Sequence, residues 1–391
     1  MNLGPSGGFT ASTGGAASGT LYEPELASVG EGFTGLSLWA VVFAGGIGSR
    51  FWPLSTPERP KQLLALISGN SLLEDTVGRL QPLIPPERVI VVTSRDIAPA
   101  IRTAVLDLPQ ENILVEPRPL GTAAALAWGA QEVARRAGPD TTICALHADL
   151  AIGFPGAFRE ALRRAAAVAN RERAIVAFGV RPTRAEPSFG YITVGAALDA
   201  EVALSEGGAF QVAAFVEKPS PVDAEKLGAR GALWHAGIMV GSAKIVLDKL
   251  GRYTPEIAPG LAALRSGNLP AFAGMIRSVS IERGLLERAV RFLVLLADFG
   301  WDDVGTWASL RRARDLDDDG NGAHGPAHFV DATSNVVHGE SGATVLFGVS
   351  RLLVVVLPGL TFITTLERAA DLKPLLDELP EKLRRSPTST A

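Results

Sequence analysis

The hydrophobic pattern changes at Leu38, where short apolar runs begin to alternate with longer stretches of helical period. The runs predicted as strands are Leu38–Ala44, Arg88–Thr93, Ile113–Val115, Thr142–Leu146, Ala174–Gly179 and Gln211–Val216. The stretches predicted as helices are Ser71–Leu83, Ala123–Arg136, Ala157–Asn170 and Ser242–Leu250. Nearly continuous apolar strands that alternate with helices predict an α/β fold with a sheet covered on both faces.

The two ends of the chain follow other patterns. Residues 1–37 are rich in Gly, Ser, Ala and Thr without an apolar period, which predicts a flexible tail. The polar stretch Asp315–Gly325 predicts a boundary, and the short apolar runs after it are Thr344–Phe347, Leu352–Val356 and Thr361–Thr365, with a helical stretch at Ala369–Leu379. We therefore predict a Rossmann-like, mixed and mostly parallel sheet over residues 38–315 and a small β-rich domain over residues 316–391.

Net charge and cysteine content limit which binding partners and which cellular compartment we expect. The 37 basic and 41 acidic residues give a net charge of −4, too balanced to predict a nucleic-acid or membrane partner. Cys144 is the single cysteine, which fits a reducing cytoplasm. The apolar run at Leu352–Leu357 is too short to span a bilayer. No Lys or Arg precedes Arg50, so a secretory signal with a basic start is absent. We expect a cytoplasmic protein.

A glycine-rich stretch, Ala44-Gly-Gly-Ile-Gly-Ser-Arg-Phe-Trp-Pro-Leu54, follows the first predicted strand. Glycines allow a tight turn whose N–H groups can cradle phosphate oxygens. Arg50 adds a bidentate cation, and Lys61 follows in Arg59-Pro-Lys-Gln62. A turn built only for close packing explains the glycines alone about equally well. The stretch has neither dinucleotide-fingerprint nor Walker spacing.

Two aspartates are further candidates. Asp149 follows the predicted strand Thr142–Leu146, where a carboxylate is costly to bury unless it is paired or metal-bound. Asp303 lies in Trp301-Asp-Asp-Val-Gly-Thr-Trp307. Taken alone, Asp149 is better explained as a solvated loop residue, and the structural alternative for Asp303 is an N-cap before a helix at Thr306.

Together these motifs resemble the sugar-1-phosphate nucleotidylyltransferases. The stretch Gly45–Gln62 is similar to their G-G-x-G-[ST]-R-x-x-P-L…P-K signature, and its Phe-Trp-Pro-Leu-Ser wording is similar to the mannose-1-phosphate guanylyltransferase branch. Phe215-Val-Glu-Lys-Pro219 resembles the family's Phe-x-Glu-Lys-Pro, and Trp301–Trp307 its Trp-x-Asp-x-Gly-x-Trp. The resemblance implies transfer from GTP to mannose 1-phosphate, which gives GDP-mannose and pyrophosphate with Mg²⁺. It also implies that residues 38–315 form the catalytic domain and allows a homodimer.

The resemblance implies a role for each matching residue. The implied catalytic residues are Arg50, Lys61, Asp149, Lys218 and Asp303, of which Asp149 and Asp303 bind the metal. The implied nucleotide-binding residues are Gly45, Gly46, Gly48, Ser49, Arg50, Glu116, Gly121 and Thr122. The implied sugar-phosphate-binding residues are Gly190, Tyr191, Glu217, Lys218 and His235.

Several motif residues differ from those usual in the family, and alternative functions therefore stay open. Leu120-Gly121 replaces the usual Arg-Asn and is closer to some sugar uridylyltransferases, His235 replaces an asparagine, and His147 precedes Asp149 where a histidine usually follows the aspartate. A nucleotidylyltransferase for another base or hexose 1-phosphate is one alternative. A catalytically idle nucleotide-sugar-binding regulatory homologue is another.

Overall fold

A computed structural model describes residues 37–46, 48–56, 58–198, 208–289, 291–312 and 316–385. The side chains of Ala308, Arg312 and Arg385 are outside this description. Residues 37–391 form one compact unit. Residues 1–36 of the predicted tail and the predicted boundary residue Asp315 lie outside the described ranges, so the division into a tail and two domains stays a prediction. Among the described residues, no helix is long and apolar enough to cross a bilayer.

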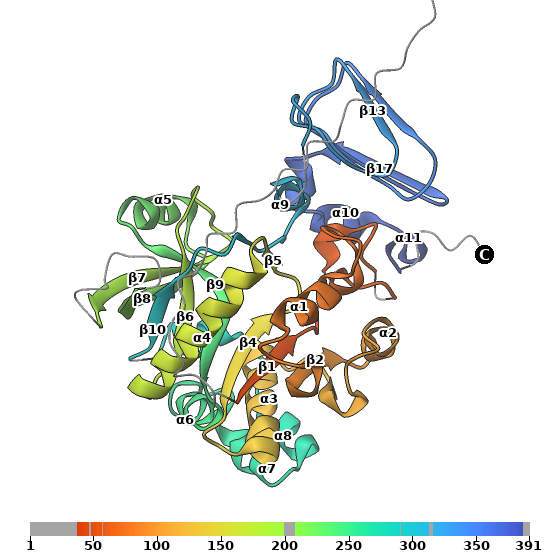
Figure 1. Ribbon diagram of the computed structural model, residues 1–391. Helices are drawn as coiled ribbons and strands as arrows, with labels where there is room; N and C mark the ends of the chain where they lie inside the picture. Colours follow the sequence, from red (N-terminus) through yellow and green to blue (C-terminus); the bar gives the residue numbers. More distant parts are fainter. Residues whose placement is uncertain are drawn as a thin grey trace, which may run out of the picture. The chain divides into compact units, whose positions relative to one another are not determined.

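The centre of the fold is a nine-stranded mixed sheet in the order β3-β2-β1-β4-β9-β6-β10-β8-β7 (Figure 1). According to these pairings, all strands except β8 and β9 point in one direction. This confirms the predicted mixed and mostly parallel sheet. The strands are β1 (Leu38–Phe43), β2 (Val89–Ser94), β3 (Ile113–Glu116), β4 (Thr142–His147), β6 (Val176–Val180), β7 (Gly190–Ala197), β8 (Ala209–Glu217), β9 (Leu233–Ser242) and β10 (Leu293–Leu296). A separate ladder pairs β5 (Ala151–Ile152) with β11 (Trp301–Asp302).

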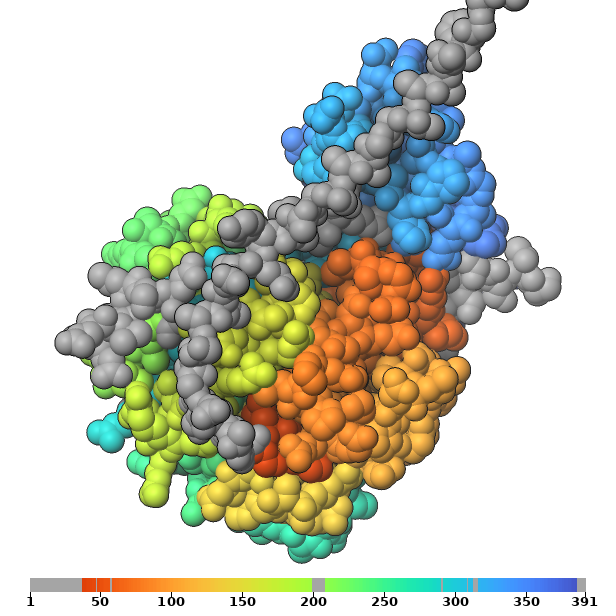
Figure 2. Space-filling view, viewed as in Figure 1, coloured from red at the N-terminus to blue at the C-terminus, as the bar shows by residue number. Residues whose placement is uncertain are grey.

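Helices cover both faces of this sheet. The helices of this part are α1 (Leu72–Leu80), α2 (Ala98–Ala104), α3 (Thr122–Ala137), α4 (Pro155–Glu172), α5 (Pro221–Ala229), α6 (Ala243–Tyr253), α7 (Leu261–Arg265), α8 (Leu269–Met275) and α9 (Trp307–Arg312). Helices α3 and α6 share a core with alternate residues of β1 and β4. Gly129 lets α3 approach β1, because a Cβ there would collide with Val41. Helix α4 contacts β4, β6 and β9, and its surface borders that of α1 in Figure 2.

Local sequence explains how several helices begin. Ser71 forms a capping box with Glu74: each side chain accepts a hydrogen bond from the other residue's backbone N–H. Ser220 and Ser242 cap α5 and α6 through their hydroxyls. Pro155 opens α4 at its first position, where a missing N–H costs nothing. These signals account for the close agreement between the predicted and observed helix starts.

The C-terminal region is rich in strands, as predicted. Its strands are β12 (Gly322–His324), β13 (Ala327–Val330), β14 (Val336–Gly339), β15 (Thr344–Phe347), β16 (Leu352–Leu357) and β17 (Leu360–Thr365), and its helices are α10 (Lys373–Glu378) and α11 (Glu381–Arg385). The predicted helix Ala369–Leu379 is wrong in its bounds. A short 3-10 turn, Arg368–Ala370, comes first, and α10 begins only at Lys373 with a proline in its first turn.

One apolar cluster joins this region to the stretch that follows β1. Phe51, Trp307, Val336 and Leu353 are fully buried in it. The rings of Phe51 and Trp307 lie 5.2 Å apart. Because Phe51 belongs to the glycine-rich stretch, the cluster packs against that stretch, and substitutions in the cluster can alter the candidate site.

Candidate active site

The glycine-rich turn begins where β1 ends. The carbonyl of Ala44 accepts hydrogen bonds from Gln62 Nε2 (2.7 Å) and from Thr93 Oγ1 (2.8 Å), which fixes the first residue of the turn. Gly48 has a φ of 76°, and a Cβ there would collide with the side chain of Lys61. Glycine is therefore required at position 48 both for the backbone conformation and for the close approach of Lys61.

Lys61 opens a short 3-10 turn, Lys61–Leu63, and its side chain is only 7% exposed. Its Nζ donates to Asp149 Oδ2 at 2.6 Å and lies 5.3 Å from the centre of the Phe51 ring. Burial alone would raise the pKa of Asp149, but the nearby Lys61 and His147 hold it below its ordinary value. Asp149 is therefore ionised and paired with a cation.

The short ladder of β5 and β11 brings the second acid to the first. Trp301 pairs with Ile152 and Asp302 with Ala151, so the chain segments that carry Asp149 and Asp303 run side by side. Burial and the neighbouring Asp302 raise the pKa of Asp303 to about 6. Gly305 must lack a Cβ, which would collide with Asp303 Oδ2.

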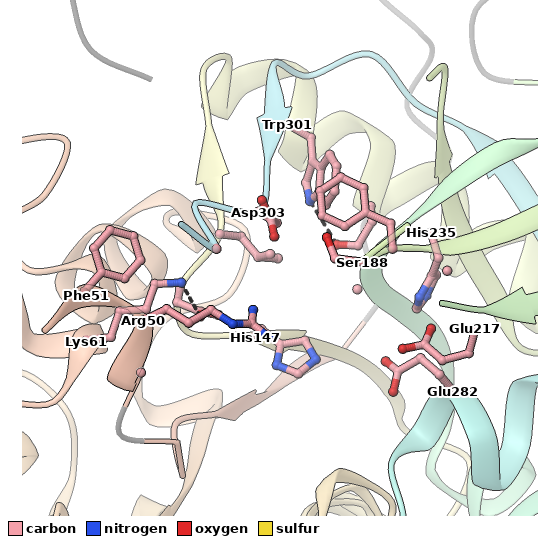
Figure 3. Close-up of a pocket in the computed structure, with 18 of the residues that line it drawn as sticks. Arg50, Phe51, Lys61, His147, Ser188, Glu217, His235, Glu282, Trp301 and Asp303 are labelled. Carbon is pink, nitrogen blue, oxygen red and sulfur yellow. Dashed lines mark hydrogen bonds and ion pairs between the residues drawn. The ribbon is translucent and has the colours of Figure 1, made fainter. Parts of the chain in front are cut away.

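A cavity of about 400 Å³ lies between these groups (Figure 3). One end is lined by Ser49, Arg50, Lys61, Asp149 and Asp303, and the other by Gly190, Glu217, His235 and Glu282. Four predicted catalytic residues thus lie around one cavity. The exception is Lys218.

A second cavity of about 360 Å³ lies on the other side of Lys61 and Asp149. Its wall includes six of the predicted nucleotide-binding residues, namely Gly45, Gly46, Gly48, Glu116, Gly121 and Thr122. Gly48, Lys61, His147 and Asp149 line both cavities, so the two are adjacent.

Glu116 is a titratable group in the wall of the second cavity. Burial raises its pKa to about 7, although the Leu120 N–H and Arg118 act in the opposite direction. Its Oε1 has no hydrogen-bond partner among the described residues. A buried carboxylate oxygen without a partner is unfavourable unless a ligand supplies a donor.

The sequence prediction differs from the structure at two sugar-site residues. Tyr191 is fully buried and its hydroxyl accepts from the Glu186 N–H at 2.9 Å, so it supports β7 and does not line the cavity. Lys218 does not line it either: its side chain is 51% exposed, and Nζ lies 3.2 Å from Glu217 Oε1. An alternating strand pattern cannot tell which face a cavity will occupy.

Sequence reasoning missed His147, Glu282 and Trp301, which all line the first cavity. Trp301 Nε1 donates to the Ala236 carbonyl at 2.9 Å and ties β11 to β9. His147 packs edge-on against Phe43, at 5.4 Å between ring centres. The position of His147 two residues before Asp149 was a usable signal, and so was the place of Glu282 in Ser280-Ile-Glu282, which is similar to a Ser-Ile-Asp segment of the family.

The two aspartates fit a magnesium ion. Within the described ranges, no three His, Cys, Asp or Glu side chains are grouped to hold a metal by themselves. Mg²⁺ commonly takes one or two protein carboxylates and fills its other positions with water and substrate phosphates. Asp149 and Asp303 line the same cavity as Ser49 and Arg50 and match that requirement.

A glycine turn, a buried lysine and two carboxylates at the ends of sheet strands define an enzyme that acts on phosphorylated nucleotides. The chain belongs to the nucleotidyl transferase family, which its residues 39–320 match.

Similar proteins carry more specific names. The mannose-1-phosphate guanylyltransferase of Klebsiella pneumoniae is 31% identical over 360 residues, which cover 89% of this chain and 75% of that protein. The one of Escherichia coli K12 is 32% identical and covers 88% and 73%. A crystal structure from Thermus thermophilus, described as a mannose-1-phosphate geranyltransferase, has a TM-score of 0.79 and 32% identity, and covers 88% of this chain and 99% of that one.

Proposed function

We propose that this protein is a cytoplasmic enzyme that transfers a guanylyl group from GTP to mannose 1-phosphate, with GDP-mannose and pyrophosphate as products. The observation that carries the proposal is the convergence of Lys61, Asp149 and Asp303 on the first cavity, where Lys61 and Asp149 also line the adjacent second cavity. The names of the similar proteins supply the two substrates. The nucleotide base would occupy the second cavity and the hexose the far end of the first.

Glu116 supports guanine as the base. A carboxylate offers two acceptor oxygens side by side, and guanine presents two donors side by side, N1–H and the N2 amino group. Uracil presents one donor, N3–H, between two carbonyl acceptors, so it would leave one oxygen facing an acceptor. The unpartnered Oε1 of Glu116 therefore suits guanine better than the other bases.

The chemistry needs no general base. A phosphate oxygen of mannose 1-phosphate is already an anion at neutral pH and attacks the α-phosphorus of GTP. A new O–P bond forms, the bond from the α-phosphorus to the bridging oxygen breaks, and pyrophosphate leaves with that electron pair. The obstacle is repulsion between anions, which cations and fixed donors reduce.

Each residue would have a distinct part in this transfer. Lys61 and Arg50 would neutralise the triphosphate, and N–H groups of the glycine turn would bind its oxygens. Asp149 and Asp303 would hold Mg²⁺, which reduces charge on the phosphates. Lys218 would turn from Glu217 toward the sugar phosphate, a motion that its half-exposed side chain permits. Positioning and electrostatics together suffice for the reaction.

The test is a matrix of GTP, ATP, UTP and dTTP against mannose, glucose and galactose 1-phosphates, with and without Mg²⁺, with pyrophosphate release as the readout. We expect the highest kcat/KM for GTP with mannose 1-phosphate, and no turnover after chelation. A preference for another pair would replace the proposed substrates. Nucleotide binding without turnover of any pair would instead indicate a regulatory homologue.

A further inference from the structure

The sugar end of the first cavity contains two carboxylates that come from distant parts of the chain. Glu217 ends β8, and its side chain is 8% exposed. Glu282 is the first residue of a π-helical turn, Glu282–Leu286. Both line the cavity, and Figure 3 shows their carboxylates next to each other. The wall of this subsite is therefore unusually rich in hydrogen-bond acceptors.

His235 completes this wall from β9. It is 7% exposed, and its Nε2 has no hydrogen-bond partner within the described residues. Figure 3 shows its ring above the Glu217 carboxylate. Burial lowers the pKa of His235 to about 4, so the imidazole is neutral and offers one donor and one acceptor. An unpartnered nitrogen in a polar cavity indicates that a ligand completes the site.

Charge around the wall is negative. Lys218 forms an ion pair with Glu217. In the proposed function Lys218 turns to the substrate phosphate, which leaves Glu217 without this cation. Burial would raise the pKa of Glu282, but His147 and the Ser280 hydroxyl act in the opposite direction, and the pKa lies below its ordinary value. Glu282 therefore stays an anion that only accepts hydrogen bonds. A ligand at this wall must supply donors.

We propose that Glu282 is a specificity-determining residue for the hexose: with Glu217 and His235 it selects sugar 1-phosphates that present free hydroxyl or amino groups and rejects N-acetylated ones. The inference rests on the proposed function. A hydroxyl donates to a carboxylate, and an ammonium both donates and neutralises charge. An acetamido carbonyl brings another acceptor to a wall where two carboxylates face a single imidazole donor, which leaves polar atoms unpaired.

The experiment compares wild type, Glu282→Gln and the control Glu287→Gln in kinetics with GTP and Mg²⁺. Glu287 belongs to the same turn region, but it is exposed and accepts a hydrogen bond from the Glu217 N–H at 2.9 Å, which a glutamine oxygen can also do. The second substrates are mannose 1-phosphate, glucosamine 1-phosphate and N-acetylglucosamine 1-phosphate. Wild type should use glucosamine 1-phosphate measurably better than its N-acetyl form.

We expect Glu282→Gln to raise the KM for mannose 1-phosphate about 10- to 100-fold, the effect of losing a hydrogen bond to a charged group. The KM for GTP should stay unchanged. The kcat/KM for N-acetylglucosamine 1-phosphate should rise relative to that for glucosamine 1-phosphate, because the glutamine amide can donate a hydrogen bond to the acetamido carbonyl. Glu287→Gln should alter these values much less. If Glu282→Gln does not fold, Glu282→Asp serves instead, because its side chain is shorter by one methylene and withdraws the carboxylate. This variant should raise the KM for the sugar phosphate and leave the KM for GTP unchanged.

Equal sugar-phosphate KM values and selectivity in folded wild type and Glu282→Gln would overturn the inference, and so would a parallel change in Glu287→Gln. These outcomes differ from failure of the proposed function, in which the wild type itself releases no pyrophosphate from any pair of substrates.

Discussion

Replacement of Glu116 by glutamine should change the preferred base. Glu116 is 7% exposed, so in the proposed function its carboxylate would contact the base in a site from which water is largely excluded. Glu116→Gln keeps the shape and one acceptor but replaces the other by an NH₂ donor. Guanine then loses one charge-assisted hydrogen bond, and a donor faces a donor. Uracil gains, because the amide can accept from N3–H and donate to the neighbouring carbonyl.

The magnitude follows from these two losses. A hydrogen bond to a charged group contributes about 1.5–3 kcal/mol, and a buried donor left unpaired costs about 1–3 kcal/mol more. The sum, about 2.5–6 kcal/mol, corresponds to a decrease of roughly 10²- to 10⁴-fold in kcat/KM for GTP. We expect the ratio of GTP to UTP efficiency to fall by at least about 100-fold.

The assay measures pyrophosphate release with GTP, UTP and ATP at saturating mannose 1-phosphate. Glu111→Gln is the matched control, because Glu111 is exposed and lies in a short turn before β3. Its base preference should equal that of the wild type. A GTP to UTP ratio that is the same in Glu116→Gln and wild type would refute the placement of the base at Glu116.

Three further outcomes are expected. The pKa of Glu116 is raised to about 7, so below that pH its carboxyl is protonated and has one acceptor fewer. The kcat/KM for GTP should therefore rise with pH through about 7 in wild type but not in Glu116→Gln. Identical pH profiles of the two proteins would contradict this. Lys61→Ala should lower kcat about 10²- to 10³-fold, as loss of a fixed donor to a developing charge does, whereas the exposed Lys226→Ala should not. Trp307→Ala should lower the free energy of unfolding by about 3–5 kcal/mol in a denaturant titration, because Trp307 is 0% exposed. Phe347→Ala should change it by less than about 0.5 kcal/mol, since Phe347 is 71% exposed, and equal losses in the two variants would argue against the apolar cluster.

Local patterns were sufficient for much of the fold. Apolar runs predicted β1, β2 and β4 within one residue of their observed ends, because strands buried on both faces leave little room for polar side chains. Capping residues such as Ser71 similarly located the helix starts. The glycine turn, Lys61 and the two aspartates also became candidates, because their motifs together resemble one family, although each motif taken alone has an ordinary structural explanation.

Only the tertiary structure decided which of these candidates share a cavity. Residue order does not reveal that β9 inserts between β4 and β6, or that β11 pairs with β5 and so brings Asp303 beside Asp149. The same long-range packing placed Glu282 in the cavity and left Tyr191 and Lys218 off its wall. Periodicity records which face of an element is buried, whereas the neighbours across that face depend on strand order and register, which distant segments determine together.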